Sequence, residues 1–547
     1  MKKTITYVLI AAILLVVAVT RFYKLGEVPV SPDWDEVALG YNAYSILKTG
    51  RDEYGTRFPL VLRSYDDYKP PLYVYLAIPS IALLGLTVPA VRLPSAVFGV
   101  LAVLGTYYLA SEVFSLSVRF RKARDQLSLI TAFLLAISPW HIQFSRIAFE
   151  ANIGLTVNIW GLLYFFKGLR RSGYMYVSAI LFGVSLYAYH SERIFVPLIV
   201  VLLAVLFRRE LWDMKRATLG AVILGILVVA PLVPVLFDKT TLTRLQGTSA
   251  FADQTLLLSR SVGKLSEDRA AGNPFGTVFD NRRIVYAQKF IDNYLTHFSV
   301  RWLFLTGDND RHHAPDSGLL HLWELPFILW GMYAVFRSRG RFAAFLFGWI
   351  LIAPIPASPT TEVPHAIRTL VFLPTFQIFA AIGISRFVVW IRMRKSVGYR
   401  FLAAGIFLVA VFFTVRYLNL YFVHLNLEFS RFWQYGYKQA VAFAKENEHK
   451  YKKIVVSTKL EQPHMFFLFY LQYDPFAYLA QGGTRTGGFA ETRNAFDIYE
   501  FREIDWYTSE VKDGSTLYIG RPDEIPDTGL LVIPYLDGTD AIHFADR

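Results

Sequence analysis

Apolar positions along the chain gather in repeated runs of roughly 16–21 residues, separated by short polar segments. A run of this length crosses the hydrocarbon core of a bilayer as an α-helix. We therefore predict a polytopic α-helical membrane protein with about eleven spans, near residues 4–20, 93–112, 128–144, 151–166, 175–191, 194–207, 217–237, 321–336, 342–356, 369–385 and 401–422. No small-x-small cleavage site follows the first run, so we expect it to remain as an uncleaved span.

One further apolar stretch, residues 71–86, is short and is interrupted by Pro79. If this stretch crossed the membrane, the basic segment 119–124 would lie outside and every later loop would be inverted. We therefore interpret it as a helix that lies in the outer interface without crossing.

The hydrophobic pattern changes after residue 422. No run there is long enough to span a membrane, and short strand-like stretches such as 453–458 and 516–520 alternate with helix-like ones. We predict a soluble extracytoplasmic α/β domain at 423–547. It would follow a transmembrane module at 1–422, whose outer loops we place at 21–92, 238–320 and 357–368.

Composition supports the membrane assignment. The chain is 54% hydrophobic with a mean hydropathy of +0.36, whereas soluble proteins are usually about 45–50% apolar. The absence of cysteine excludes disulfides, thiol catalysis and thiolate metal sites.

The net charge of +13 is concentrated on one side of the predicted membrane. The short segments on the N-terminal side hold 21 of the 56 Lys and Arg residues but only three of the 43 Asp and Glu residues. This asymmetry follows the positive-inside rule. We therefore predict a cytoplasmic N-terminus in the cytoplasmic (cell) membrane of the cell envelope. Because the charge sets topology, we expect no nucleic-acid partner.

Three carboxylates follow the first span closely, in the stretch SPDWDEVALGY: Asp33, Asp35 and Glu36. One interpretation is a helix capping box, with Asp33 as N-cap and Glu36 as its partner, but this leaves Asp35 unexplained. The other is a general base or metal ligand at the boundary between membrane and water. The residues that follow predict an amphipathic helix on the membrane surface.

Lys69 precedes Pro70 and Pro71, which would start the interfacial helix because Pro is favoured at the first helical position. A phosphate at this height could meet both the lysine and the free backbone N–H groups of the helix start. The alternative is a lysine that only extends its amine toward the headgroups.

Together these motifs form a recognisable series: a carboxylate pair after the first span, an amphipathic helix, KPPL at 69–72 and VRLPSAVFG at 91–99. The series resembles the GT-C superfamily of membrane glycosyltransferases, in particular family 39, the protein O-mannosyltransferases, and the bacterial aminoarabinose transferases. The resemblance covers residues 1–200 well and 290–420 loosely. It implies a GT-C type fold and the transfer of a hexosyl or pentosyl group from a polyprenyl-phosphate carrier to an acceptor that is a protein, a glycan or a lipid.

The resemblance also implies roles for individual residues. Asp35, with Glu36 beside it, stands where such enzymes carry the catalytic acid that deprotonates the acceptor or organises a metal. Lys69 stands where the family lysine contacts the carrier phosphate. Glu150, in FSRIAFEANIG, matches an acid after the third span that helps form the site. A divalent metal ion held by Asp35 and Glu150 stays an open alternative.

Further charged residues lie near the predicted outer ends of the spans. Arg146 precedes Glu150 by four residues, which would place both on one helical face, either as a local ion pair or with Arg146 bound to the carrier phosphate. Arg193 and Arg368 are additional expected phosphate ligands. The expected substrate-binding residues are Asp33, His190, His312, His313 and His365.

The expected chemistry needs these residue types. A departing lipid phosphate is negatively charged, so Lys and Arg must stabilise it, while a weakly nucleophilic hydroxyl or amine needs a base. Two other functions remain as hypotheses: a transporter or flippase for a polyprenyl-linked glycan, and a non-catalytic binding protein. Transporters commonly hold charges near the bilayer midplane within repeated halves, whereas here the charges lie at outer ends and the sequence has no internal repeat.

Overall fold

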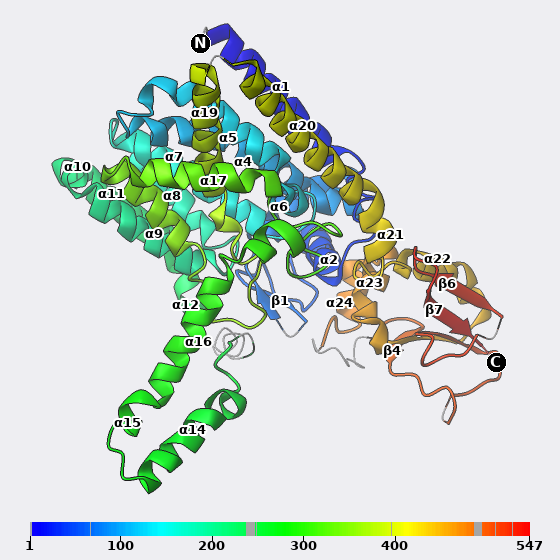
Figure 1. The fold of residues 1–547 in the computed structure, drawn as a ribbon. Helices are drawn as coiled ribbons and strands as arrows, with labels where there is room; N and C mark the ends of the chain where they lie inside the picture. The colour runs from blue at the N-terminus through cyan, green and yellow to red at the C-terminus, as the bar shows by residue number, and fades with distance from the viewer. Residues whose placement is uncertain are drawn as a thin grey trace.

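Apolar helices form most of the chain before residue 430 in the computed structural model (Figure 1), which describes residues 3–65, 67–236, 247, 249–394, 396–485, 495–508, 510–527 and 529–546. A helix lies at each of the eleven predicted spans. These helices are α1 (Lys3–Phe22), α4 (Val88–Ser115), α5 (Arg124–Ile137), α7 (Ala151–Gly168), α8 (Gly173–Ser185), α9 (Glu192–Leu206), α11 (Lys215–Val229), α17 (Leu325–Phe336), α18 (Gly340–Ile352), α19 (Thr375–Arg394) and α20 (Val397–Asn419).

Within the described part of the chain, five helical stretches are long and apolar enough to cross a membrane. They are Lys3–Phe22, Val88–Ser115, Lys215–Val235, Leu370–Arg394 and Val397–Phe429. Four shorter apolar helices accompany them, at Leu72–Leu84, Gly173–Ser185, Leu322–Phe336 and Gly340–Ile352. The molecule is therefore a multi-pass membrane protein, while the number of eleven spans stays a prediction.

Helices α17 and α19 approach each other backbone to backbone. A Cβ atom added at Gly331 would overlap the carbonyl oxygen of Phe379, and one added at Gly383 would overlap that of Phe327. Small residues let membrane helices pack this closely and gain dispersion energy where no hydrophobic driving force exists between them. The two glycines thus fix the distance between α17 and α19.

The predicted span at 128–144 is not one continuous helix. Helix α5 ends at Ile137, and a second short helix, α6 (Pro139–Phe144), begins directly after the extended residue Ser138. Proline disfavours the helical conformation at the residue before it. Ser138 precedes Pro139, which explains the break. The chain then turns through residues 145–150 before α7 begins.

The first outer loop carries α2 (Trp34–Thr49), the hairpin β1 (Leu62–Ser64) and β2 (Asp67–Lys69), and α3 (Leu72–Leu84). The predicted capping box of α2 is confirmed: the Asp33 side chain accepts from the Glu36 N–H at 2.9 Å, and the Asp33 N–H donates to the Glu36 carboxylate. The box fixes where α2 starts, and therefore the direction in which Asp35 projects.

The amphipathic pattern of α2 suggested a polar face in contact with water. The structure instead covers that face with protein. Asn42 and Ser45 on that face are buried, and Asn42 donates to the Glu53 carboxylate at 2.8 Å. The burial arises because α2 is packed against α3 on one side and against α23 (Pro463–Tyr470) on another.

A helical arm leaves the bundle after α12 (Val233–Leu236) and consists of α14 (Gln254–Ala270), α15 (Gly276–Phe279) and α16 (Arg282–Thr296) (Figure 1). It belongs to the predicted outer loop 238–320, of which residues 238–246 and 248 lie outside the described residues.

Residues 430–546, here called the C-terminal segment, form a five-stranded sheet with helices packed against it. The strand order is β4-β3-β5-β7-β6, with β4, β3 and β5 parallel and β7 and β6 antiparallel to their neighbours. The strands are β3 (Lys453–Ser457), β4 (Tyr499–Arg502), β5 (Thr516–Gly520), β6 (Leu531–Pro534) and β7 (Asp540–Ala545), and the other helices are α21 (Leu425–Phe429), which precedes the segment, α22 (Tyr437–Asn447) and α24 (Pro475–Ala480).

The hydrophobic core of the C-terminal segment continues into the first outer loop. Val37, Tyr41 and Tyr73 belong to the same buried cluster as Phe466 and Phe469. The two modules predicted on either side of residue 422 therefore share part of their hydrophobic core. The continuity places the C-terminal segment beside α2, and the Trp34 N–H at the start of α2 donates to the Gln434 side chain.

Candidate active site

A cavity of about 160 Å³ lies between the first outer loop and two later loops, 308–312 and 362–367. Of the twelve site residues predicted from the sequence, six line this cavity. They are Asp35, Lys69, Glu150, His190, His312 and His365. The fold therefore gathers residues from six separate parts of the chain around one space, as expected of a ligand site.

An ion pair between Asp35 and Lys69 lines the cavity. The capping box orients Asp35 in the first turn of α2, and the β1–β2 hairpin ends at Lys69 and presents it from the opposite side. The Lys69 side chain is 8% exposed and that of Asp35 is 32% exposed. Burial alone would lower the pKa of Lys69, but the carboxylates of Asp35 and Glu150 outweigh it and raise that pKa.

Glu36 does not reach this cavity, although the resemblance grouped it with Asp35. Its carboxylate is fully buried, accepts two hydrogen bonds from Arg92 at 2.8 and 2.9 Å, and accepts the Ala148 N–H at 2.8 Å. A carboxylate whose oxygens are all engaged in this way positions the elements around it. The catalytic role expected for Glu36 stays a prediction that this geometry does not favour, because its carboxylate is engaged by Arg92 and the Ala148 N–H.

Arg146 and Glu150 do not share a helical face. The prediction is wrong because α6 ends at Phe144 and α7 begins only at Ala151, so both residues lie in the turn between the helices. The Arg146 guanidinium is buried and donates to the Thr20 carbonyl at the end of α1 and to the Val28 carbonyl in the turn that follows. It stabilises this helix end, and it does not line the cavity that Glu150 enters.

Asp33 is also buried, beneath the cavity wall. Besides capping α2, it accepts from the Arg311 guanidinium at 3.1 Å, and Arg311 lies over the Trp34 ring at 4.4 Å. Burial and the nearby charge of Asp35 raise the pKa of Asp33 to about 7, against the opposing effect of Arg311. Asp33 is thus a link between α2 and the 308–312 loop, and the substrate-binding role expected for it stays a prediction.

Asp308, His312 and His365 form a group in which one ligand atom of each residue lies within 4.8 Å of the others. The Nδ1 atom of His365 and one oxygen of Asp308 are buried without a hydrogen-bond partner. Burial and nearby cationic groups lower the pKa of His365 well below its usual range, so its ring is neutral. For Asp308, burial would raise the pKa, but His312 and the Ala366 N–H lower it. A neutral imidazole and an ionised carboxylate with unused lone pairs fit a transition-metal ion.

Three other nominated residues lie away from the cavity lining. Arg193 donates to the Leu186 carbonyl at 3.4 Å, Arg368 donates to Thr360 and to the Thr361 carbonyl at 2.6 and 2.7 Å, and His313 pairs with the Ala314 carbonyl at 2.8 Å. Arg193 and Arg368 as phosphate ligands, and His313 as a substrate ligand, stay predictions that this geometry does not favour.

The sequence reasoning did not single out Asp308 or Arg311. The signal was present for Asp308, because it precedes His312 by four residues, the spacing of one helical turn. The other member of the group, His365, lies far along the chain. Arg311 could not be predicted, because the residues it contacts, Asp33 and Trp34, are distant in sequence.

Comparison with known proteins gives one family match and several similar structures. Residues 68–234 match the family model of dolichyl-phosphate-mannose-protein mannosyltransferases. Among solved structures, ArnT from Cupriavidus metallidurans bound to undecaprenyl phosphate aligns with a TM-score of 0.53 at 13% identity, over 100% of this chain and 98% of that one. A comparison with curated proteins finds no match.

The archaeal oligosaccharyltransferase AglB from Archaeoglobus fulgidus, in complex with an inhibitory peptide and a dolichol-phosphate, aligns with a TM-score of 0.51 at 14% identity. The alignment covers 86% of this chain and 64% of AglB, so this chain spans less than two thirds of that enzyme's length. A second AglB structure, with a TM-score of 0.50 at 15% identity over 84% of this chain and 61% of that one, contains Zn and sulfate. At these identities the likeness shows a shared fold.

Proposed function

We propose that this multi-pass membrane protein, which has the GT-C fold of membrane glycosyltransferases, moves a hexosyl or pentosyl group from a polyprenyl-phosphate carrier to an acceptor at the outer face of the cytoplasmic membrane. The observation that carries the proposal is the Asp35–Lys69 ion pair in a cavity that Glu150 also lines. Both halves of the reaction, a base and a cation for the leaving phosphate, meet there.

The residues act as follows in the proposed reaction. An acceptor hydroxyl or amine approaches the anomeric carbon of the donor sugar and gives its proton to Asp35. As the bond from the acceptor atom to the anomeric carbon forms, the bond from that carbon to the phosphate oxygen breaks. The electron pair stays on the phosphate, whose charge Lys69 stabilises. Glu150, which lines the same cavity, helps to hold the lysine in its charged form.

We further propose that Asp308, His312 and His365 bind a metal ion of the zinc type rather than Mg²⁺ or Ca²⁺, because two of the three ligands are imidazoles. Such an ion would supply Lewis-acid stabilisation for negative charge near the cavity. The sequence left open a metal ion held by Asp35 and Glu150. These two carboxylates are less favoured as metal ligands, because Asp35 already pairs with Lys69.

The test uses purified protein in nanodiscs with a panel of radiolabelled polyprenyl-phosphate hexoses and pentoses. We expect release of free polyprenyl phosphate by the wild type and a loss of roughly 10²–10⁴-fold in Asp35→Asn, the usual contribution of a general base. Glu503→Gln, an exposed carboxyl in the C-terminal segment, is the matched control and should keep full activity.

The outcome also separates this proposal from the other two hypotheses. Carrier movement across the bilayer without release of polyprenyl phosphate would identify a flippase. The protein would be a non-catalytic binding protein if it binds the carrier but shows no turnover when acceptor is supplied. In that case the wild type and Asp35→Asn would behave alike. Either result would overturn the transferase proposal.

A further inference from the structure

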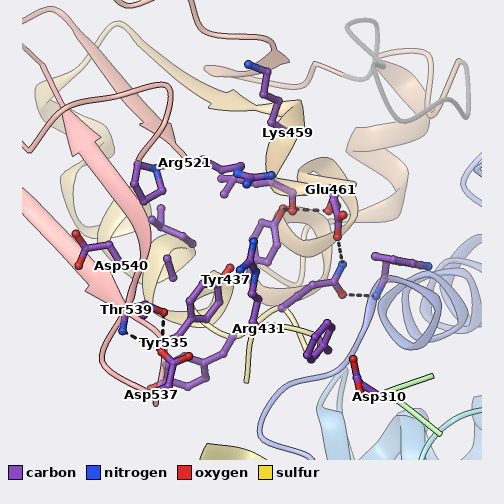
Figure 2. Close-up of a pocket in the computed structure, with 18 of the residues that line it drawn as sticks. Asp310, Arg431, Tyr437, Lys459, Glu461, Arg521, Tyr535, Asp537, Thr539 and Asp540 are labelled. Atoms are coloured by element: carbon purple, nitrogen blue, oxygen red, sulfur yellow. Dashed lines mark hydrogen bonds between the residues drawn. The ribbon is translucent and has the colours of Figure 1, made fainter. Parts of the chain in front are cut away.

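A second and larger cavity, of about 890 Å³, is lined mostly by residues of the C-terminal segment (Figure 2). Its walls come from both halves of the molecule: Trp34 at the start of α2, the loop 308–311, and residues of the C-terminal segment between 431 and 542. The volume falls within the range of about 300–1,000 Å³ that small-molecule sites occupy. The C-terminal segment therefore closes a ligand-sized space.

This larger cavity adjoins the catalytic one. Asn309 and Arg311 line both of them, so these side chains form a layer that the two spaces share. The Arg311 guanidinium is held in that layer by Asp33 at 3.1 Å and by the ring of Trp34 at 4.4 Å. A ligand in the larger cavity would thus lie next to the cavity that contains Asp35.

The lining combines aromatic rings with charged groups of both signs. Five aromatic residues contribute to it, together with six carboxylates and four cationic side chains. In Figure 2, Tyr437 and Arg431 lie at the centre, Asp537 and Thr539 on one side, and Lys459 and Glu461 on the other. Only Leu460, Pro522, Ala541 and Ile542 of the 22 lining residues are aliphatic.

This composition selects among acceptor chemistries. An acyl chain would find little apolar wall, and a polyanion would meet more carboxylates than cations. A sugar chain fits both features, because its C–H faces stack on aromatic rings while its hydroxyls donate to carboxylates and accept from guanidinium groups. Among the described residues, Asp310 and Arg431 form no ion pair with another side chain, which leaves their hydrogen-bonding groups for such a ligand.

We infer that the larger cavity binds the acceptor and that the acceptor is an uncharged or amino-bearing oligosaccharide, a conclusion that rests on the proposed function. One of its hydroxyls would extend past Arg311 to Asp35 and become the nucleophile. Tyr535 and Arg431, both from the C-terminal segment, contact the bound chain and set its affinity without touching the donor.

The experiment measures binding of soluble neutral oligosaccharides, from two to four glucose, mannose or N-acetylglucosamine units, to the full-length protein in nanodiscs by calorimetry. Tyr535→Ala and Arg431→Ala should each weaken binding about tenfold or more. Tyr507→Ala is the matched control, because Tyr507 is a 74% exposed tyrosine of the same segment that does not line the cavity. Binding of the polyprenyl-phosphate donor should be equal in all four proteins.

The same proteins are then assayed for release of polyprenyl phosphate with and without the oligosaccharides, or with a panel of peptides. Stimulation by an oligosaccharide that is lost in Tyr535→Ala and Arg431→Ala supports the inference. Stimulation by peptides alone, or no oligosaccharide binding, overturns it while the proposed function stands. Oligosaccharide binding that depends on Tyr535, together with no turnover of any donor, would overturn the proposed function and with it the acceptor role.

Discussion

At the scale of single residues, the molecule shows how burial changes the role of a carboxylate. Asp35 and Glu36 are neighbours in sequence, yet the first enters a cavity and the second is fully buried against Arg92. The sequence could nominate Asp35, Lys69 and Glu150 because their motifs are local. It could not show that Glu36 and Arg146 lie outside the cavity lining, because the partners that occupy them come from distant segments.

Glu53 allows a prediction of pH dependence. It is buried between Asn42 of α2 and Thr484 of the C-terminal segment, and burial raises its pKa to about 7. Since the folded-state pKa lies above the unfolded value of about 4.3, the folded state binds more protons between these values. The stabilisation by the protonated carboxyl is complete below about pH 4 and is lost as pH rises toward 7. At roughly 1.4 kcal/mol per pKa unit, this is about 4 kcal/mol in all.

The test compares the Tm of wild type and Glu53→Gln between pH 5 and pH 8. The neutral glutamine should gain stability relative to the wild type as pH rises, because only the wild type must ionise a buried group. Exposed Glu503→Gln should track the wild type throughout. Parallel curves for wild type and Glu53→Gln would show that Glu53 titrates normally.

The proposed metal site is tested by measuring how many metal ions the purified protein retains per chain. Protein purified without chelator and supplied with Zn²⁺ should retain about one ion per chain, while His312→Ala and His365→Ala should each lose most of it, because metal sites need their full ligand set. The exposed His424→Ala serves as control. Equal metal content in all four proteins, measured by plasma mass spectrometry, would place the ion elsewhere.

At the scale of elements, the apolar runs predicted where the helices lie, since burial in lipid demands continuous hydrophobic length. They did not predict the break at Ser138, which depends on one proline, or the burial of both faces of α2. The polar pattern of α2 indicated a water-facing surface, whereas Asn42 and Ser45 instead bond with protein groups. Periodicity reveals which face is polar, and only the tertiary structure reveals what that face meets.

The contact between α17 and α19 gives a prediction at this scale. Gly331→Ala and Gly383→Ala should each destabilise the protein by about 1–3 kcal/mol, because the new methyl group must push apart two backbones in contact. Gly405→Ala, in α20, is the control: a Cβ there meets nothing within 4 Å. A thermal midpoint for Gly331→Ala equal to that of Gly405→Ala would contradict the close packing.

At the scale of the whole molecule, the C-terminal segment and the first outer loop behave as one body, because they share a core. A chain shortened after residue 430 should keep the packed bundle of α4, α5 and α7 but leave α2 without the helix α23 that covers it. Amide hydrogen exchange should therefore become faster in residues 34–49 and stay slow in α5 and α7. Unchanged protection of α2 would show that the bundle alone orders it.

The link between Trp34 and Gln434 has a consequence for biosynthesis. The Trp34 N–H donates to the Gln434 side chain at 3.0 Å across 400 residues of sequence. At about 5–20 residues per second, translation takes tens of seconds to make the second partner after the first. During that interval the spans can insert, but the start of α2, and with it the Asp35 carboxylate, has no finished support. Catalytic competence would then arrive only after Gln434 has been made, so shorter nascent chains in the membrane would not consume the donor.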